Sequence, residues 1–473
     1  MLFNSSEFFI FLPIVFFLYW FVLKNSFRQQ NIMLLGASYF FYGWFDWRFL
    51  GLLILSTVID YSFGFWVANG TERKKKLFLW LSIFNNLIIL GFFKYYNFFV
   101  TEAAIFLGNL GFHAHPYVLN IVLPLGISFY TFHGMSYVLD IYRGNFKPIA
   151  NFVDYAVFVC FFPLLVAGPI ERASHLLPQI TTSRKFSYAQ GVQGLRLMLW
   201  GFFKKVVVAD SLAPIVDDIY KNYHTYSGST VALGAIYFSF QIYCDFSGYT
   251  DIALGTAKLF GFELLTNFKF PYFSRNIAEF WRRWHISLSS WFRDYLYIPL
   301  GGGRTTRAKA VRNTFIIFLV SGFWHGANWT FIVWGGIHAL LFIPLLLGNK
   351  NRQFTGPIVA YDRSLPTLKE LAQMLLTFTL ATLAWVFFRC PDMATSFAIL
   401  KQMTVNFFHV PALKSFMLFY VAPLVLIDWY FRRDERALAF PRNRALRYIT
   451  YAVMFVVIIY HSNNNASFIY FQF

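Results

Sequence analysis

The chain has 473 residues, of which 58% are hydrophobic and 22% aromatic, whereas only 13% are charged. Since an ordinary soluble domain is about a quarter charged, this composition excludes a water-soluble globular protein and predicts one that has the lipid bilayer as its solvent. The formal net charge is +18, but Lys and Arg gather in short clusters between apolar runs, which indicates cytoplasmic loops and argues against nucleic acid as a partner.

The N-terminal part of the chain reads as a series of membrane spans. A crossing takes about 20 apolar residues, and the first run covers residues 8–23. Residues 31–67 are interrupted by Asp46 and Arg48, which predicts two short helices that turn at a membrane surface. If the basic clusters on either side of this pair are cytoplasmic, the N-terminus lies outside. The first run lacks a basic lead and a cleavage site, so we expect it to remain as a span rather than to be removed as a signal peptide.

The remaining spans continue to the end of the chain. The length rule gives roughly ten to twelve in all, with further runs at residues 77–100, 118–138, 153–166, 195–216, 231–259, 314–323, 329–347, 371–388, 416–431 and 448–460. Glycine and proline within residues 118–138 predict broken or kinked helices that line protein or a cavity. No soluble domain or repeat interrupts the series, so we expect an all-α polytopic protein with a single membrane domain over residues 1–473.

Polar residues at membrane depth mark the first candidate site segment. Residues 245–251 carry Asp245, Ser247 and Asp251 within an apolar run, and such residues are costly in a membrane unless they serve a function. Carboxylates six positions apart lie on different faces of a helix and make a poor acid/base pair, and Gly248 suggests a local break. A structural role between helices and a direct role in a site both remain open.

A second segment, residues 279–295, has its aromatic and apolar residues at the spacing of one helical face. Arg282, Arg283 and Arg293 fall beside this stripe, and His285 lies on its apolar side. The pattern predicts one amphipathic helix that lies in the membrane interface or dips partly into the membrane, rather than crossing it. A histidine in this position alone is more often structural than catalytic.

The third segment, residues 321–330, contains His325 between Trp324 and Gly326, with His338 further along. A neutral imidazole in a low-dielectric pocket can accept a proton from a hydroxyl, and adjacent glycine lets a substrate approach the backbone. The residues alone leave a catalytic and a structural role for His325 equally open.

These segments resemble the paired histidine motifs of the membrane-bound O-acyltransferase (MBOAT) family. The likeness lies in the Trp-His-Ile-Ser-Leu of residues 284–288 and the Trp-His-Gly of residues 324–326, about forty residues apart. It is closest to the bacterial branch that includes the alginate O-acetylation membrane subunit and the D-alanyl transferase of teichoic acid. Further motifs of the alginate type lie at residues 124–130, 167–170, 244–249 and 280–285.

The resemblance implies a fold of roughly 10–12 transmembrane helices, with re-entrant or interfacial helices, around a central tunnel. It also implies a catalytic core at about residues 118–345, in which His325 is the active-site histidine and His285 its polar partner. An acyl thioester such as acetyl-CoA would arrive from the cytoplasm, and the acyl group would leave toward an acceptor outside.

Acyl transfer from a thioester needs a base, positioning and donors for the oxyanion. His325 would be the base, and His285, Asn328 or backbone N–H groups would orient it or stabilise the oxyanion. The predicted substrate-binding residues are Asn328, Trp324, Trp284, Arg282, Arg283, Asp245 and Ser247. Arginines here and in the glycine loop of residues 301–304 would attract an anionic donor, although a turn with positive-inside charge explains that loop equally simply.

No tightly bound cofactor and no metal are expected. The pair His113 and His115 has no obvious further ligands. The three cysteines, Cys160, Cys244 and Cys390, lie far apart and form neither a disulfide framework nor a metal-binding pattern.

The leading hypothesis is a multi-pass O-acetyltransferase of the cell inner (cytoplasmic) membrane, in contact with membrane lipid, that moves acetyl groups across it for O-acetylation of an exported or cell-surface polysaccharide. The resemblance implies that a periplasmic SGNH-type acetyltransferase partner completes the transfer to this acceptor. The alternatives are D-alanyl or other acyl transfer to a cell-envelope polymer, a transporter, and a non-catalytic scaffold for an extracytoplasmic acetyltransferase.

Overall fold

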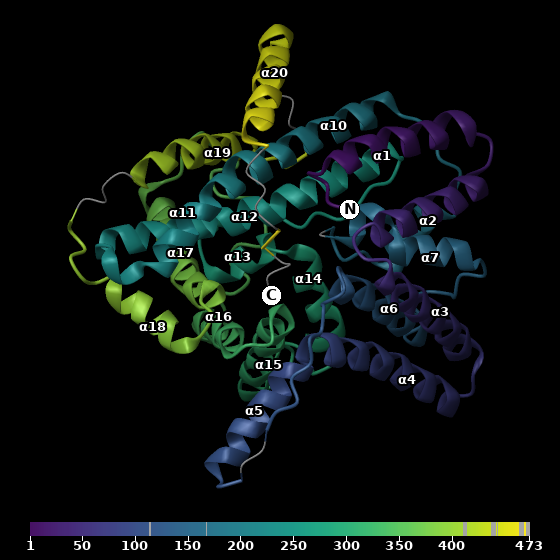
Figure 1. Ribbon diagram of the computed structural model, residues 1–473, viewed down its shortest axis with the longest axis horizontal. Coiled ribbons are helices and arrows are strands. Elements are labelled where there is room, and N and C mark those ends of the chain that lie inside the picture. Colours follow the sequence, from purple (N-terminus) through teal and green to yellow (C-terminus); the bar gives the residue numbers. More distant parts are fainter. Residues whose placement is uncertain are drawn as a thin grey trace. The chain divides into compact units, whose positions relative to one another are not determined.

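The computed structural model describes residues 1–112, 115–166, 168–409, 414–436, 441, 443–462 and 468–469. Throughout these residues the regular structure is helical, without strands (Figure 1). The all-α prediction is therefore confirmed. Contacts between residues divide the chain into two compact units, one of residues 1–191 with 256–265 and the other of residues 192–255 with 266–473.

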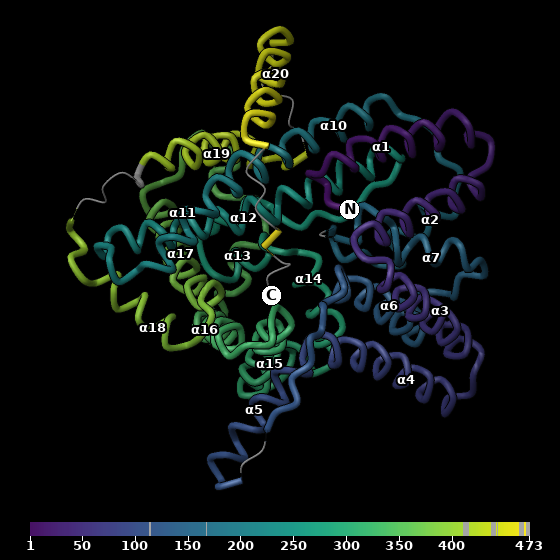
Figure 2. Tube along the Cα trace, viewed as in Figure 1, coloured from purple at the N-terminus to yellow at the C-terminus, as the bar shows by residue number. Residues whose placement is uncertain are grey.

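The first unit contains the N-terminal helices, and α10 and α12 each have one end in it. Its own elements are α1 (Ser6–Phe17), η1 (Leu18–Val22), α2 (Phe27–Gly43), α3 (Arg48–Asn69), α4 (Glu72–Leu90), η2 (Gly91–Tyr95), α5 (Tyr96–Asn109), α6 (Ile127–Tyr142), α7 (Phe152–Cys160), α8 (Phe162–Leu165) and α9 (Ala173–Ile180). The chain passes from α4 into α5 without a loop and changes direction near η2, a π-helical turn (Figure 2). Such turns are a common cause of helix bends.

A buried carboxylate joins three helices of this unit. Asp60 on α3 is 1% exposed and accepts hydrogen bonds from Ser82 Oγ (2.7 Å) and Asn86 Nδ2 (3.0 Å) on α4. Gly134 on α6 lies so close that a Cβ there would overlap the Asp60 carboxylate. Polar side chains at this depth therefore hold neighbouring helices together, because each finds its partner within the protein.

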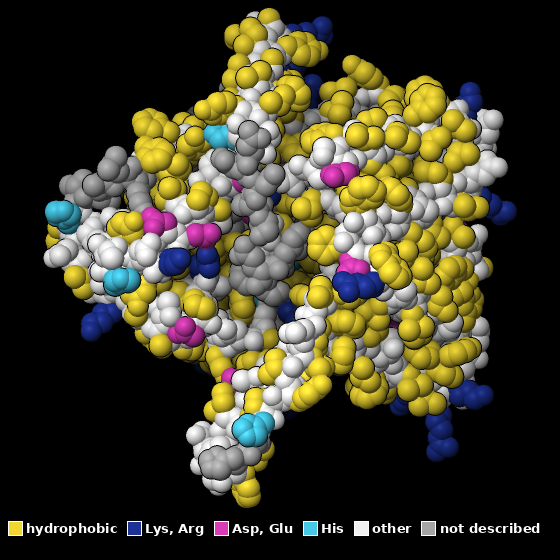
Figure 3. Space-filling model, in the orientation of Figure 1, with side chains coloured by type: hydrophobic (Ala, Val, Ile, Leu, Met, Phe, Trp, Pro, Cys, Tyr) yellow, Lys and Arg dark blue, Asp and Glu magenta, His cyan; other side chains and the backbone are white. Residues whose placement is uncertain are grey.

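Several helices are suited to a membrane. Among the described residues, four are long and apolar enough to cross one, at residues 48–69, 72–109, 329–347 and 368–389. Hydrophobic side chains coat the face of α3 and α4 seen in Figure 3. The count of roughly ten to twelve spans remains a prediction.

The interruption expected at Asp46 and Arg48 is confirmed, since α2 ends at Gly43 and α3 begins at Arg48. The span expected at residues 118–138 is wrong in its first part, because helix α6 begins only at Ile127. Gly126 precedes it with φ +69°, a conformation that favours glycine, and stops any helix from running in from residue 118.

The second unit holds all segments with candidate site residues. Its elements are η3 (Phe203–Ala209), α11 (Asp210–Lys221), η4 (Tyr223–Thr225), η5 (Pro271–Phe273), α13 (Ile277–Arg283), α14 (Ile286–Phe292), η6 (Arg293–Tyr297), α15 (Arg307–His325), α16 (Trp329–Leu347), α17 (Leu368–Arg389), α18 (Met393–Gln402), η7 (Lys414–Met417), α19 (Leu418–Phe431) and α20 (Arg444–His461), together with most of α10 (Tyr188–Phe202) and α12 (Gly228–Leu259).

Helix α12 is continuous through Gly248, so the predicted break there is wrong. The glycine serves close packing instead: a Cβ on Gly248 would come within 2.8 Å of the Gly201 carbonyl oxygen, and Gly255 meets the Gly194 carbonyl in the same way. Because these glycines have no side chains, the backbones of α10 and α12 can approach each other closely.

Helices α15 and α16 form a tightly packed hairpin. A Cβ added to Gly322 on α15 would overlap the carbonyl oxygen of Phe331, and one added to Gly335 on α16 would overlap that of Phe318. His325 ends α15, so this crossing places the first catalytic candidate.

Replacing Gly335 by alanine is expected to destabilise the protein by about 1–3 kcal/mol, because backbone atoms of α15 must move to admit one methyl group. Gly336→Ala is the matched control, since its Cβ would meet only Leu319 Cδ2 at 3.7 Å, an ordinary contact. Thermal unfolding of the two detergent-purified variants measures the difference. Equal midpoints would show that the hairpin tolerates the added methyl group.

Candidate active site

The segment of residues 279–295 does not form the single amphipathic helix that its periodicity predicts. The α13 helix ends at Arg283, α14 starts at Ile286, and a π-helical turn follows from Arg293. Figure 2 shows α13 and α14 as separate turns of chain. The break falls at Trp284 and His285.

His285 has a left-handed backbone conformation, with φ +43°. This conformation costs a residue with a side chain about 1–3 kcal/mol and persists where the surroundings impose it. Here the N–H of Ile286 donates to the carbonyl of Asn267 (2.9 Å), and the N–H of Lys269 donates to the carbonyl of Arg283 (3.0 Å). Residues 267–269 thus hydrogen-bond to the chain on both sides of Trp284 and His285 and hold these two residues in a non-helical conformation.

The His285 side chain is buried in an aromatic environment. It is 1% exposed, and its ring lies edge-on to Phe246 of α12 with a centroid separation of 4.7 Å. Burial lowers the pKa of the His285 imidazole to about 3, so the ring is neutral near pH 7. The neighbouring Trp284 packs against Phe268, Phe280 and Trp385.

His325 lies in the same aromatic cluster. It is 3% exposed, and its ring contacts Trp324, Trp334 and Phe388 at centroid separations of 4.9, 5.2 and 5.2 Å. Trp324 in turn lies 6.2 Å from the His285 ring. The indole of Trp324 therefore connects the two histidines, which are forty positions apart in the sequence.

The contacts of His338 indicate a structural role for this residue. It is fully buried on α16, its Nδ1 accepts a hydrogen bond from Trp281 Nε1 (3.2 Å), and its ring stacks near Phe280 and Phe318. It joins α13 to α16 and thereby holds the helix that precedes His285.

Asn328 begins helix α16. Its Oδ1 accepts from the Thr330 N–H (3.0 Å), the usual N-cap arrangement, and its Nδ2 donates to the Pro391 carbonyl (2.7 Å). These bonds fix the backbone just after His325. A contact between Asn328 and substrate remains a prediction.

Asp245 and Ser247 face a pair of buried lysines. Lys205 Nζ lies 2.7 Å from Asp245 and 2.7 Å from Asp210, while Lys204 Nζ contacts Asp251 (2.6 Å) and Ser247 Oγ (3.0 Å). The two carboxylates of α12 thus have separate cationic partners, as the six-residue spacing indicates. Phe246, between Asp245 and Ser247, is the residue of this segment that contacts His285.

Comparison with known proteins decides the family. The model of the membrane-bound O-acyltransferase family matches residues 145–357. The probable alginate O-acetylase AlgI of Azotobacter vinelandii is 39% identical over 85% of this chain and 78% of its own length, and the peptidoglycan O-acetyltransferase of Helicobacter pylori is 36% identical over 85% and 80%. The teichoic acid D-alanyltransferase of Bacillus subtilis is 30% identical over 47% and 58%.

The chain belongs to the membrane-bound O-acyltransferase family. It is accordingly a membrane protein and an O-acyltransferase, which confirms the family, the enzyme class and the general function predicted from the motifs. Both histidines lie within the matched residues.

A large cavity of this acyltransferase adjoins the segment around His285. Its volume is about 770 Å³, and it opens beside α13, α14 and α15. Apolar residues such as Ile286, Leu288 and Phe318 line it, together with Glu279 and a set of basic residues: Lys269, Arg282, Arg283, Arg293, Arg304 and Arg352. A cavity lined by both apolar and cationic side chains suits an acyl group attached to an anionic carrier.

The predicted binding residues Arg282 and Arg283 also have structural partners. Arg282 donates to the carbonyls of Asn351 (2.9 Å) and Phe354 (3.0 Å), and Arg283 pairs with Glu279 (2.9 Å). Both residues line the cavity, but the hydrogen bonds of their guanidinium groups are made to the protein itself. Their contact with a substrate remains a prediction.

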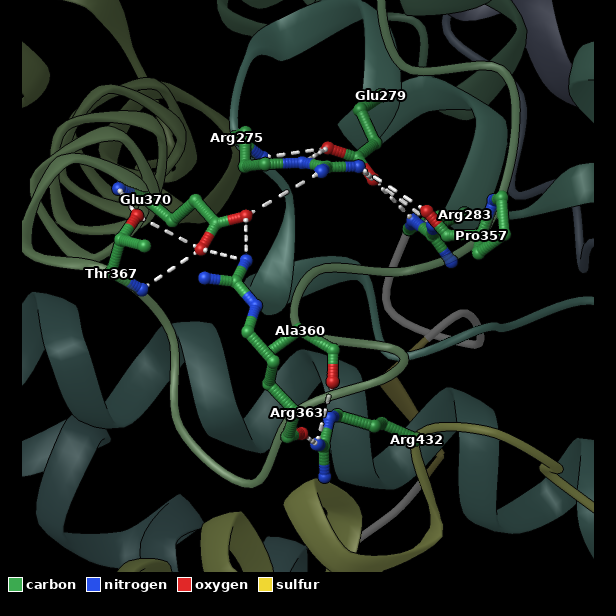
Figure 4. A network of polar contacts seen from close by, with 9 residues as sticks. All are labelled: Arg275, Glu279, Arg283, Pro357, Ala360, Arg363, Thr367, Glu370 and Arg432. Carbon is green, nitrogen blue, oxygen red and sulfur yellow. Dashed lines mark hydrogen bonds and ion pairs between the residues drawn. The ribbon is translucent and has the colours of Figure 1, made fainter.

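A polar network anchors α13 to the start of α17 (Figure 4). Glu279 lies between Arg275 and Arg283, and accepts 3.0 Å and 2.9 Å bonds on the same oxygen. Glu370 binds Arg363 (2.9 Å), while Arg432 donates to the carbonyls of Ala360 and Arg363. Three segments distant in sequence therefore support the helix that leads to His285.

Sequence reasoning missed Asn267, which contacts the break at His285, and the α17 residues Trp385 and Phe388, which complete the aromatic cluster. An apolar helix gives no signal that distinguishes these rings from lipid-facing ones. His113, considered as a metal ligand, and Ala167 of the 167–170 motif lie outside the described residues.

Proposed function

We propose that this O-acyltransferase moves acetyl groups from a cytoplasmic thioester across the inner membrane for O-acetylation of an exported or cell-surface polysaccharide. The observation that carries the proposal is the pair of buried histidines joined by Trp324. The names of the more similar relatives, an alginate O-acetylase and a peptidoglycan O-acetyltransferase, support acetyl as the group transferred. Residues 1–473 would act as one membrane domain with its catalytic core at about residues 118–345.

The proposed step is direct displacement at a thioester. The oxygen of an acceptor hydroxyl attacks the carbonyl carbon, a C–O bond forms and the C–S bond breaks. His325 takes the hydroxyl proton, which then passes to the departing thiolate sulfur, so that neither an oxidant nor a metal is required. Exclusion of water by the surrounding aromatic rings protects the thioester from hydrolysis.

The cavity beside α14 supports a donor such as acetyl-CoA. Its basic residues suit the phosphate groups of that donor, and the apolar lining residues Ile286 and Leu288 suit its pantetheine arm. The guanidinium groups of Arg304 and Arg352 would make these contacts together with Arg282 and Arg283.

The direct acceptor would be either the polysaccharide or a periplasmic SGNH-type acetyltransferase that completes the transfer. D-alanyl transfer to a cell-envelope polymer is the second candidate, and the teichoic acid D-alanyltransferase relative favours it at lower identity and coverage. Scaffold and transporter roles would not require the two histidines.

The test is mass spectrometry of cell-surface polysaccharide from a deletion strain that carries wild type, His325→Ala or His285→Ala at equal membrane levels. Wild type is expected to restore O-acetyl groups and both variants to leave them absent. D-alanyl esters in place of acetyl groups would favour the second candidate. Full restoration by His325→Ala would overturn the proposed site and favour a scaffold.

A further inference from the structure

Asn267, which lies outside the histidine motifs, hydrogen-bonds through its side chain to the candidate catalytic imidazole of His285. It lies between α12 and η5 and is fully buried. Its Oδ1 contacts His285 Nδ1 (3.4 Å), Ser287 Oγ (2.6 Å) and the Ser287 N–H (3.3 Å), and its own carbonyl accepts from the Ile286 N–H. One residue therefore binds the whole left-handed turn at His285.

The orientation of the Asn267 amide follows from these partners. The atom nearest Ser287 must accept a hydrogen bond, because a backbone N–H only donates. The same atom faces His285 Nδ1, and an amide oxygen cannot donate. The contact is therefore made by a protonated Nδ1, which in a neutral imidazole leaves Nε2 unprotonated.

The far nitrogen of His285 is correspondingly available. Nε2 is buried and has no hydrogen-bond partner in the described parts of the chain. The edge-on ring of Phe246 and the neighbouring Trp324 restrict rotation of the imidazole. An unprotonated, oriented and unpaired ring nitrogen can accept a hydrogen bond from a hydroxyl, but in this state it cannot donate one to an oxyanion.

We infer that Asn267 is a positioning residue that fixes His285 in the Nδ1–H tautomer, so that Nε2 accepts a hydrogen bond from a further hydroxyl of the acceptor while His325 takes the proton of the attacking one. The inference rests on the proposed function for the role of His285 and adds the residue that sets its direction. From the sequence, His285 either orients the base or stabilises the oxyanion. Because Nε2 in this tautomer accepts hydrogen bonds and cannot donate them, the inference excludes oxyanion stabilisation by His285.

The Asn267 amide nitrogen borders a small polar cavity. Asn267 lines this cavity of about 30 Å³ together with Lys204, Thr250 and Asp251, and its Nδ2 has no hydrogen-bond partner among the residues that the structure describes. A space of this size admits about two water molecules, which would accept from Nδ2. The amide would then be fixed with its oxygen toward His285, whereas a flipped amide would direct its donor group toward the Ser287 N–H.

The experiment compares Asn267→Leu, which removes the oxygen, with Asn267→Asp, which keeps it. Initial rates are measured in membranes with acetyl-CoA as the donor probe, and are normalised to folded protein by fluorescence-detected size exclusion. Asn267→Leu is expected to lower kcat about 100-fold with little change in KM, because misplacement of a reacting group costs about this much. Asn267→Asp is expected to stay within about tenfold of wild type.

The pH profile separates a positioning role from a purely structural one. A carboxylate beside Nδ1 favours the charged imidazolium, so in Asn267→Asp the acidic limb of the rate profile is expected to move to higher pH. Asn86→Leu is the control: Asn86 is also a buried asparagine, and within the described parts of the chain its side chain bonds to Asp60 and to the carbonyl of Ser82. It is expected to lower the amount of folded protein without moving the profile.

The outcomes distinguish failure of the positioning role of Asn267 from failure of the proposed role of His285. Equal loss in Asn267→Leu and Asn267→Asp, or near wild-type kcat in Asn267→Leu, would overturn the positioning role. If Asn267→Leu does not fold, Asn267→Ala takes its place in the same comparison with Asn267→Asp. Retained activity in His285→Ala would instead overturn the proposed function of His285, whatever the Asn267 variants do.

Discussion

Replacing His325 by phenylalanine is expected to lower the rate of acyl transfer about 1,000-fold, within the range that a general base contributes. The substitution keeps an aromatic ring in contact with Trp324, Trp334 and Phe388 but removes the nitrogen that would take the hydroxyl proton. The measurement is the initial rate of acetyl transfer from acetyl-CoA in membranes, normalised to folded protein.

His338→Phe is the matched control for this prediction. His338 is buried in the same aromatic cluster, nine residues after the start of α16. Its imidazole accepts a hydrogen bond from Trp281. We expect a rate within about tenfold of wild type, since loss of one neutral hydrogen bond costs about 1 kcal/mol. A comparable collapse in both variants would mean that the ring cluster, rather than proton transfer at His325, determines the rate.

The sequence predicted the fold class and the family because both depend on strong, local signals. Apolar runs and their interruptions placed most helices, including the turn between α2 and α3. The paired motifs at His285 and His325 identified the family, and the structure brings both into one aromatic cluster through Trp324. Motif spacing alone does not determine this proximity, which depends on the packing of α13, α15 and α17.

The errors arose where tertiary hydrogen bonds or close packing override a local pattern. The periodicity of residues 279–295 indicates one helix, but Asn267 and Lys269 pair with the chain at His285 and Arg283 and break it there. Gly248 suggests a break, but it is the point at which α12 approaches the Gly201 backbone, and the helix continues. In both cases the deciding partner lies fourteen or more positions away, beyond the range of any helical period.

Glu279→Ala is expected to destabilise the protein by about 3–5 kcal/mol, the usual cost when one partner of a buried ion pair is removed. The Glu279 side chain is 1% exposed and pairs through Oε1 with both Arg275 and Arg283, and its Oε2 accepts from the Arg275 N–H (2.8 Å). Its removal would leave the largely buried guanidinium group of Arg283 without its anion and would leave Arg275 with Glu370 at 4.0 Å. Thermal unfolding of detergent-purified protein measures the loss.

Glu279→Ala also tests whether Glu279 only supports the site or takes part in the reaction. Glu72→Ala is the control, because Glu72 is 79% exposed in its pair with Lys75, and such surface pairs contribute about 0–1 kcal/mol. Since Arg275, Glu279 and Arg283 frame the helix that ends one residue before the break, the Glu279 variant should lose activity in parallel with folded protein, and its pH profile should not move. A shifted pH profile at full stability would place Glu279 in the reaction itself. A stability equal to that of Glu72→Ala would mean that the network in Figure 4 does not hold α13 in place.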